Sequence, residues 1–133
     1  EEKGYTYGIS AGIMFYPDSG LLAISTETDN EYVEPLIQEV YHEIDRLHQE
    51  PVSAEELTIV RNYMLGEMCR SYESPFSLSD AWIFIATSGL DDDYFSRSLL
   101  AVNEVTPMEI QDLAQRYLCK ETLKEVIAGK KLS

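Results

Sequence analysis

The stretch YTYGISAGIMFYPDSGLLAISTET, residues 5–28, decides the fold because it has the pattern of two strands joined by a tight turn. Residues 5–16 mix aromatic and β-branched side chains with small ones in the alternation that is typical of a strand. Residues 17–20, PDSG, have turn chemistry, with proline first and glycine last. Residues 21–28 complete the pattern, and we predict an antiparallel hairpin.

After the hairpin, the hydrophobic period changes to that of a helix. Residues 30–49 place their apolar side chains at three- and four-residue spacings, with Asp29 or Asn30 as the cap. Pro35 then has to lie in the first turn, where proline is tolerated. The predicted apolar face consists of Val33, Leu36, Ile37, Val40, Ile44 and Leu47.

A second long helix is expected after residue 53, since Ser53 and Glu56 form a capping box. Its predicted apolar stripe consists of Leu57, Val60, Met64 and Met68. Further helices should follow, the first within residues 73–90, with Gly89 as its C-cap. Its predicted apolar face consists of Leu78, Trp82 and Ile85.

The last two helices are predicted from their N-terminal signals. The aspartates at 91–93 suit the positive end of a helix dipole and precede a short helix that extends to about residue 105. Thr106 and Glu109 form another capping box around Pro107, which is a strong helix start. Residues 123–129, LKEVIAG, then favour a final strand.

The predicted fold is α+β, a single domain over residues 1–133. We expect a two-layer sandwich in which helices pack on one face of a mainly antiparallel sheet. These four or five helices present more apolar surface than three strands can cover. Part of the sheet is therefore expected to lie outside this chain.

Composition excludes some classes of partner. The formal net charge is −14 with only ten Lys and Arg residues, so we expect no nucleic-acid binding, which requires clustered cations. No apolar run approaches the roughly 20 residues of a membrane span, and we expect a soluble protein without membrane contact. The sequence slightly favours the cytoplasm as the compartment.

Cys69 and Cys119 are too far apart in sequence for a metal motif and are predicted to be reduced and buried.

Both histidines lie in YHEIDRLH, residues 41–48, yet they do not form a zinc motif. His42 and His48 are six residues apart, which separates them by roughly 120° around a helix, so they cannot chelate one ion together. The inverted HxxEH motif fails as well, because Asp45 and Arg46 stand at the required positions. Glu39 and His42 are better explained as a surface pair. We predict no metal site and no cofactor in this chain.

Tyrosines offer the one plausible supporting role in catalysis. Tyr5 and Tyr7 are predicted to point to the same side of the first strand. A phenol at a strand end can donate a hydrogen bond to a substrate carbonyl or to the oxyanion that develops from it. The alternation of residues alone favours a simpler interpretation, in which the two aromatic side chains pack on one face of the sheet.

Several segments together resemble the C-terminal domains of the pitrilysin/insulinase family of zinc peptidases, which includes the mitochondrial processing peptidases. The resemblance begins with EEKGYTYGISAG and TETDNEYVEPLIQEVYHEIDRL. It continues through VSAEELTIVRNYMLGEM, SPFSLSDAWIFIATSGLDDDYF and VNEVTPMEIQDLAQRYL. Each motif is loose, but their order and spacing together are specific, and they cover nearly the whole chain.

The resemblance implies a fold of two halves, each a sheet backed by helices. The N-terminal half of such a peptidase carries the HxxEH zinc site, which this chain lacks. The second half closes over the substrate and contributes an arginine and a tyrosine seven residues apart. That tyrosine falls on Tyr7, whereas the arginine would precede Glu1 by one place. No complete catalytic site is therefore expected here, and a preceding strand and helix are expected to be missing.

The implied function is a substrate-binding domain that completes the chamber of a zinc metalloendopeptidase. Its expected partners are a peptide substrate and the N-terminal zinc-binding half of the same protein or of a partner subunit. Zinc is expected in that half, and this chain alone should hydrolyse nothing. Two alternatives are a non-catalytic scaffold subunit that pairs with an active peptidase, and a free-standing α+β binding module. The latter would form a homo-oligomer through its unpaired sheet edge.

Overall fold

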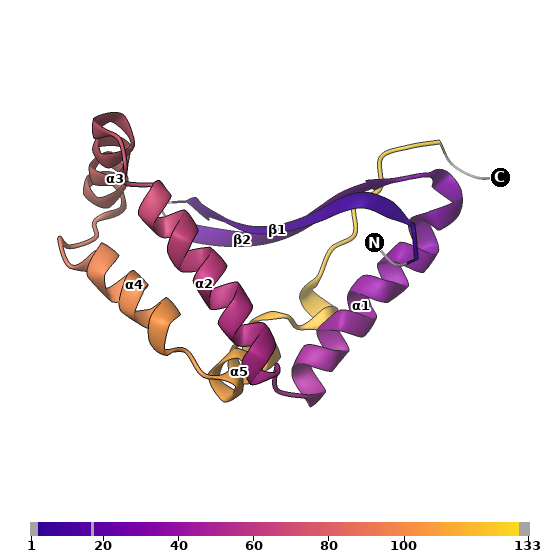
Figure 1. Ribbon diagram of the computed structural model, residues 1–133. Coiled ribbons are helices and arrows are strands. Elements are labelled where there is room, and N and C mark those ends of the chain that lie inside the picture. Colours follow the sequence, from indigo (N-terminus) through magenta and orange to yellow (C-terminus); the bar gives the residue numbers. More distant parts are fainter. Residues whose placement is uncertain (1–2, 17, 131–133) are drawn as a thin grey trace. The chain divides into compact units, whose positions relative to one another are not determined.

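The computed structural model describes residues 3–16 and 18–130. The regular elements in this part of the chain are β1 (Thr6–Tyr16), β2 (Ser19–Thr28), α1 (Val33–Gln49), α2 (Ala54–Arg70), α3 (Pro75–Ser88), α4 (Tyr94–Glu104) and α5 (Pro107–Tyr117) (Figure 1). Single 3₁₀ turns occupy Asn30–Tyr32 and Lys120–Thr122. Helices together with an antiparallel strand pair confirm the predicted α+β class.

The chain divides into two compact units. One comprises residues up to Arg46 together with those from Leu118 onwards, and the other comprises Leu47–Tyr117. The first unit contains the hairpin and most of α1, and the second contains α2–α5. The single domain and the missing strand and helix stay predictions.

The hairpin forms as predicted, but its turn is shorter. Tyr16 pairs with Ser19, and Phe15 pairs with Gly20. Two residues therefore connect the strands, and Ser19 and Gly20 already belong to β2. Asp18 is the described residue of this turn, and Pro17 lies outside the described residues.

Side chains on both faces of the hairpin are exposed within the first unit. The register places Ile9, Ala11 and Ile13 on one face and Ser10, Gly12 and Met14 on the other, and all six are exposed. Two strands about 5 Å apart make a ribbon narrower than a helix of roughly 10 Å, so such a ribbon offers little surface on which a helix can pack. The layer of helices predicted on one face of the sheet stays a prediction.

Helix α1 follows its predicted pattern. Leu36 and Ile44 are buried on the predicted apolar face, and the other members of that face are half-buried. Asp29 occupies the N-cap of the preceding 3₁₀ turn without a capping bond from its side chain. Its carbonyl accepts the Tyr32 amide at 2.9 Å.

The strand predicted at residues 123–129 does not form; this segment is irregular. It is held to α1 by side chains, because the Tyr41 hydroxyl donates to Glu125 Oε1 at 2.8 Å and Lys120 forms an ion pair with Asp45. Val126 is 92% exposed. Strand propensity depends on a neighbouring strand to pair with, and none of the described strands pairs with this segment.

In the second unit, α2 packs against α4 through a charged side chain that the predicted stripe missed. Arg61 donates from Nε to the Val102 carbonyl at 3.1 Å and from Nη2 to the Val105 carbonyl at 2.6 Å. It thereby satisfies carbonyl groups at the end of α4, which lack helical partners. Leu57 is buried as predicted, whereas Val60 and Met64 are exposed.

Helix ends follow the sequence signals closely. Ser53 accepts the Glu56 amide at 3.1 Å, and Thr106 and Glu109 form the predicted capping box, with the Thr106 amide 2.8 Å from Glu109 Oε2. That bond and the one from the Thr106 hydroxyl lower the pKa of Glu109. Gly89 ends α3 in the left-handed region at φ 65°, where glycine has no steric penalty.

Three smaller predictions have mixed outcomes. Ile85 is buried, but Leu78 and Trp82 on the same predicted face of α3 are exposed. The prediction that both cysteines are buried is wrong, since Cys69 is exposed and Cys119 is only half-buried. Among the residues described here, no helix has the length and apolar character to cross a membrane.

The cap of α3 provides a stability test. Ser74 and Ser77 form a reciprocal capping box, with the Ser77 amide 3.0 Å from Ser74 Oγ. Ser74→Ala is expected to lower the free energy of unfolding by about 1 kcal/mol, because one helix-terminal amide loses its acceptor. Urea unfolding followed by circular dichroism measures this change.

The matched control is Ser79→Ala, an exposed position within the same helix. It should leave stability unchanged or raise it by a few tenths of a kcal/mol, because alanine has the higher helix propensity. Equal losses in the two variants would contradict the capping role of Ser74.

Candidate functional site

A β-bulge in β1 positions the predicted site residue Tyr7. Thr6 pairs with Thr28 and Ile9 pairs with Thr26, so Tyr7 and Gly8 together stand opposite the single residue Glu27. A bulge of this kind bends the strand and redirects the side chains within it. Tyr7 is consequently not an ordinary member of the hairpin ladder.

Hydroxyl groups hold the bulge in place. Thr6 Oγ1 accepts a hydrogen bond from the Gly8 amide at 3.1 Å and lies 2.7 Å from the Glu27 carbonyl, to which it can donate. Thr26 Oγ1 lies 2.8 Å from Thr6 Oγ1 and donates to the Gly8 carbonyl at 2.9 Å. The backbone groups that the bulge removes from the regular ladder thus acquire side-chain partners.

The Tyr7 side chain is fully exposed, at 108% of its reference area. It borders a shallow hollow of about 310 Å³. The hollow is lined by Tyr7, Thr6, Gly8, Ser10, Ser25, Thr26 and Glu27. A phenol, several hydroxyls and one carboxylate can together exchange hydrogen bonds with a polar chain such as a peptide backbone.

Tyr5 has surroundings unlike those of Tyr7. It precedes β1, is partly buried, and stacks on Tyr32 with ring centroids 5.5 Å apart and an interplanar angle of 26°. Its carbonyl accepts a hydrogen bond from the Thr28 hydroxyl. Tyr5 therefore anchors the start of the hairpin, and only Tyr7 is displayed to solvent.

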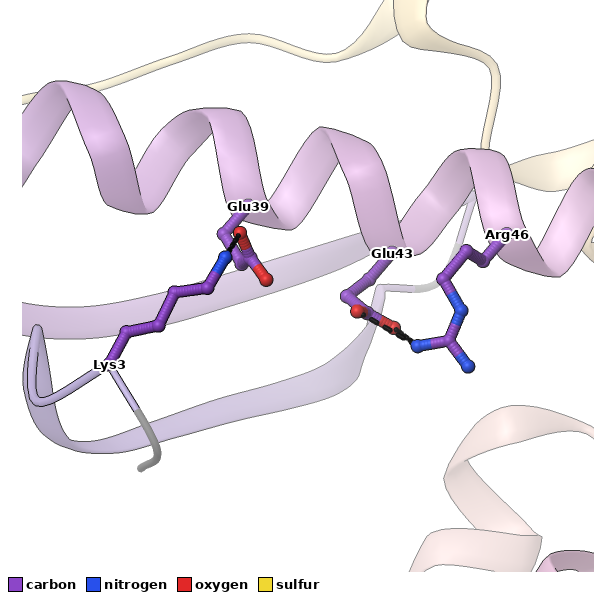
Figure 2. Close-up of polar contacts among 4 residues, drawn as sticks. All are labelled: Lys3, Glu39, Glu43 and Arg46. Atoms are coloured by element: carbon purple, nitrogen blue, oxygen red, sulfur yellow. Dashed lines mark hydrogen bonds and ion pairs between the residues drawn. The ribbon is translucent and has the colours of Figure 1, made fainter.

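Lys3 ties the segment before β1 to α1. Its ammonium forms an ion pair with Glu39 (Figure 2). The hydrogen bond from Lys3 lowers the pKa of Glu39, and the same bond raises the pKa of Lys3. Gly4 follows in the left-handed region at φ 65°, which lets the chain turn from this contact into the strand.

This ion pair was not predicted from the sequence. The spacing of Glu39 and His42 predicts a surface pair, and His42 contributes to lowering the pKa of Glu39, but the larger effect comes from the hydrogen bond with Lys3, 36 positions away. Glu1 and Glu2, which with Lys3 form the charged lead-in, lie outside the described residues. The spacing of residues along a helix identifies side chains that are neighbours on that helix, so it cannot predict the contact between Lys3 and Glu39.

The two histidines are not among the residues that hold the bulge. His42 is exposed. His48 Nε2 lies 3.0 Å from the Ala114 carbonyl, and the His48 carbonyl accepts from Gln111 at 2.9 Å, so His48 joins the end of α1 to α5. Within residues 3–16 and 18–130, no three His, Cys, Asp or Glu side chains are grouped to hold a metal ion.

One protein-family model matches the N-terminal part of the chain. The family model described as "Peptidase M16 inactive domain" covers residues 1–64, from the hairpin into α2. Over this segment the chain matches the inactive domain of the M16 peptidases. The match confirms the predicted resemblance to the C-terminal domain of a pitrilysin-family peptidase. No curated protein gives a significant match.

The M16 match includes Tyr7, the bulge and Glu39, and it ends within α2. The hairpin and α1 are therefore similar to part of the inactive domain of that family. The resemblance of α3, α4 and α5 to the same family rests on their sequence motifs alone and stays a prediction.

The contact between Lys3 and Glu39 predicts a measurable pKa change. Lys3→Gln should raise the pKa of Glu39 toward its ordinary value of 4.5, because the carboxylate loses its cationic partner. Titration of the Glu39 carboxyl by NMR measures this change. Arg46→Gln is the matched control, since Arg46 pairs with Glu43 at 2.9 Å on the same helix (Figure 2) and should leave the pKa of Glu39 unaltered.

The sign of the pH dependence follows from the two shifts. The pair stabilises the fold above the ordinary pKa of Glu39, and its contribution is lost as the pH falls through the lowered value. At the alkaline end, its contribution is lost as the pH rises through the raised pKa of Lys3. An unchanged Glu39 pKa in Lys3→Gln would rule out the ion pair in solution.

Proposed function

We propose that this chain is the substrate-contacting domain of a zinc metalloendopeptidase and completes its reaction chamber. The zinc-binding half would come from the same protein or from a partner subunit. The match of residues 1–64 to the M16 inactive-domain model supports the peptidase context. Direct contact between this domain and the peptide substrate is the part of the proposal that goes beyond that match.

The observation that carries the proposal is the display of Tyr7. A tyrosine ring exposed at 108% contributes nothing to packing, although aromatic rings usually bury a large area. It stands at a bulge whose backbone is held by Thr6 and Thr26. Bulges are over-represented beside active sites, where they direct a side chain away from the ladder.

Tyr7 would act by donating its phenolic hydrogen to the substrate. Zinc bound in the other half would supply the activated water for peptide hydrolysis. The Tyr7 hydroxyl, directed at the carbonyl under attack, would orient that carbonyl and stabilise the negative charge that develops on its oxygen. A fixed donor has this effect because it needs no reorganisation when the charge appears.

The rest of the hollow would receive the peptide backbone. A Cβ added at Gly8 would meet no atom within 4 Å, so the space above the bulge is open to an approaching chain. Ser10 and Ser25 add hydroxyls along the same border. These groups bind main-chain amides and carbonyls without selecting a side chain, as a domain that holds extended peptides requires.

The test is the substitution Tyr7→Phe, made in the complete gene product that contains this chain and its zinc-binding half. We expect kcat/KM for a quenched fluorescent peptide to fall about tenfold or more, mainly in kcat, because the donor acts on the developing charge. The ring and its exposure are retained, so stability should not change.

Tyr16→Phe is the matched control, being an exposed tyrosine at the other end of β1. It should leave kcat/KM within twofold of the unmodified protein. Equal rates for Tyr7→Phe and the unmodified protein would refute the assigned role. No hydrolysis by the complete protein, with zinc bound, would favour the scaffold-subunit alternative.

A further inference from the structure

The bulge brings a hydroxyl of β2 into contact with the backbone beside Tyr7. Residues three apart in a regular strand lie on opposite faces. The register, however, pairs Thr6 with Thr28 and Ile9 with Thr26. Paired residues share a face, and so do Thr26 and Thr28, which are two apart in β2. The extra residue of the bulge therefore places Thr6 on the same face as Thr26, where their Oγ1 atoms lie 2.8 Å apart.

The hydroxyls of Thr6 and Thr26 connect the two backbone groups of Gly8. The Gly8 amide donates to Thr6 Oγ1 at 3.1 Å, and the Gly8 carbonyl accepts from Thr26 Oγ1 at 2.9 Å. Together with the contact between the two hydroxyls, these bonds form a closed ring. The Gly8 amide belongs to the same peptide plane as the Tyr7 carbonyl. The ring therefore fixes the Tyr7 backbone from its C-terminal side.

Tyr7 depends on its backbone for the direction of its side chain. The side chain is 108% exposed, so no packing within the first unit sets the direction of the ring. Gly8 follows directly, and glycine restricts the backbone less than any other residue. A group that acts on a substrate carbonyl has to be held near the productive geometry, since a displacement of about 1 Å can lower a rate by about two orders of magnitude.

We propose that Thr26 is a positioning residue for Tyr7, holding the Gly8 carbonyl so that the Tyr7 phenol is directed at the substrate carbonyl. This inference rests on the proposed function of Tyr7 and adds a residue of β2 to it. Thr26 acts through the backbone, because the Gly8 carbonyl takes up its hydroxyl hydrogen. Thr6 is less suited to a test, since its Oγ1 also lies 2.7 Å from the Glu27 carbonyl and its removal would disturb the whole bulge.

Thr26→Val in the complete gene product tests this role, because valine keeps the β-branched shape and the strand propensity and removes the hydroxyl. We expect kcat for a quenched fluorescent peptide to fall about fivefold or more, with KM within twofold of the unmodified protein. Thr26→Ser keeps the hydroxyl and should keep kcat within twofold. Hydrogen exchange across residues 6–9, measured by mass spectrometry in the same protein, should be faster in Thr26→Val than in Thr26→Ser.

A second measurement repeats the change in the Tyr7→Phe protein. With no phenolic hydroxyl left to direct, Thr26→Val should lower kcat by less than a further twofold, because residues that act as a unit have non-additive effects. Thr28→Val is the matched control, since the Thr28 hydroxyl also donates to a backbone carbonyl, that of Tyr5, from a position two residues further along β2. It should leave kcat within twofold.

Several results would overturn the proposal. An unaltered kcat in Thr26→Val, beside a lowered kcat in Tyr7→Phe, would remove Thr26 from the mechanism and leave the proposed function standing. Equal losses in Thr26→Val and Thr28→Val, or losses that multiply with Tyr7→Phe, would show a general weakening of the hairpin. A raised KM with kcat unaltered would mean that Thr26 binds the peptide directly. Unaltered exchange in Thr26→Val would show that the bulge does not need this hydroxyl.

Failure of the proposed function would look different. Unaltered rates in both Tyr7→Phe and Thr26→Val would overturn the role of Tyr7 and, with it, the role of Thr26.

Discussion

Strand pairing between β1 and β2 is the constraint on which the first unit depends. The ladder from Tyr16 and Ser19 to Ile9 and Thr26 fixes which side chains share a face. At the bulge the ladder is interrupted, and hydroxyls of Thr6 and Thr26 replace the lost backbone partners. Both the composition of each hairpin face and the position of Tyr7 follow from this register.

Helix α1 and the 3₁₀ turn before it hold the two ends of the first unit through side-chain contacts. Lys3 and Tyr5 reach Glu39 and Tyr32 from the segment that leads into β1. From the other end of the sequence, Lys120 and Glu125 reach Asp45 and Tyr41. Exposed ion pairs are individually weak, so the arrangement relies on several such contacts together with the buried Leu36 and Ile44.

The sequence predicted local features well because their causes are local. Caps such as Ser53, Gly89 and Thr106 involve atoms within a few residues, and the apolar period of α1 identified Leu36 and Ile44. Tyr7 was singled out by resemblance, and its exposure could not have been derived from alternation. A bulge is set by the partner strand, which a single strand's pattern does not contain.

Sequence patterns do not predict structure where a residue distant in the sequence decides it. Residues 123–129 have strand-forming side chains, yet Glu125 of this segment bonds to Tyr41 of α1, and Lys120 just before it pairs with Asp45. Arg61 lies where a helical stripe predicts an apolar residue, because the end of α4 offers carbonyls to its guanidinium. The pairing of Lys3 with Glu39 likewise joins residues that no short motif connects.

The bulge at Tyr7 and Gly8 has a consequence for how such a domain can diverge. Because these two residues stand opposite Glu27 alone, the side chain at position 7 is released from the alternation that governs residues 9–16. Substitutions there leave the hairpin's own faces unchanged. A lineage can therefore alter what this point presents to its surroundings while the strand register is inherited intact.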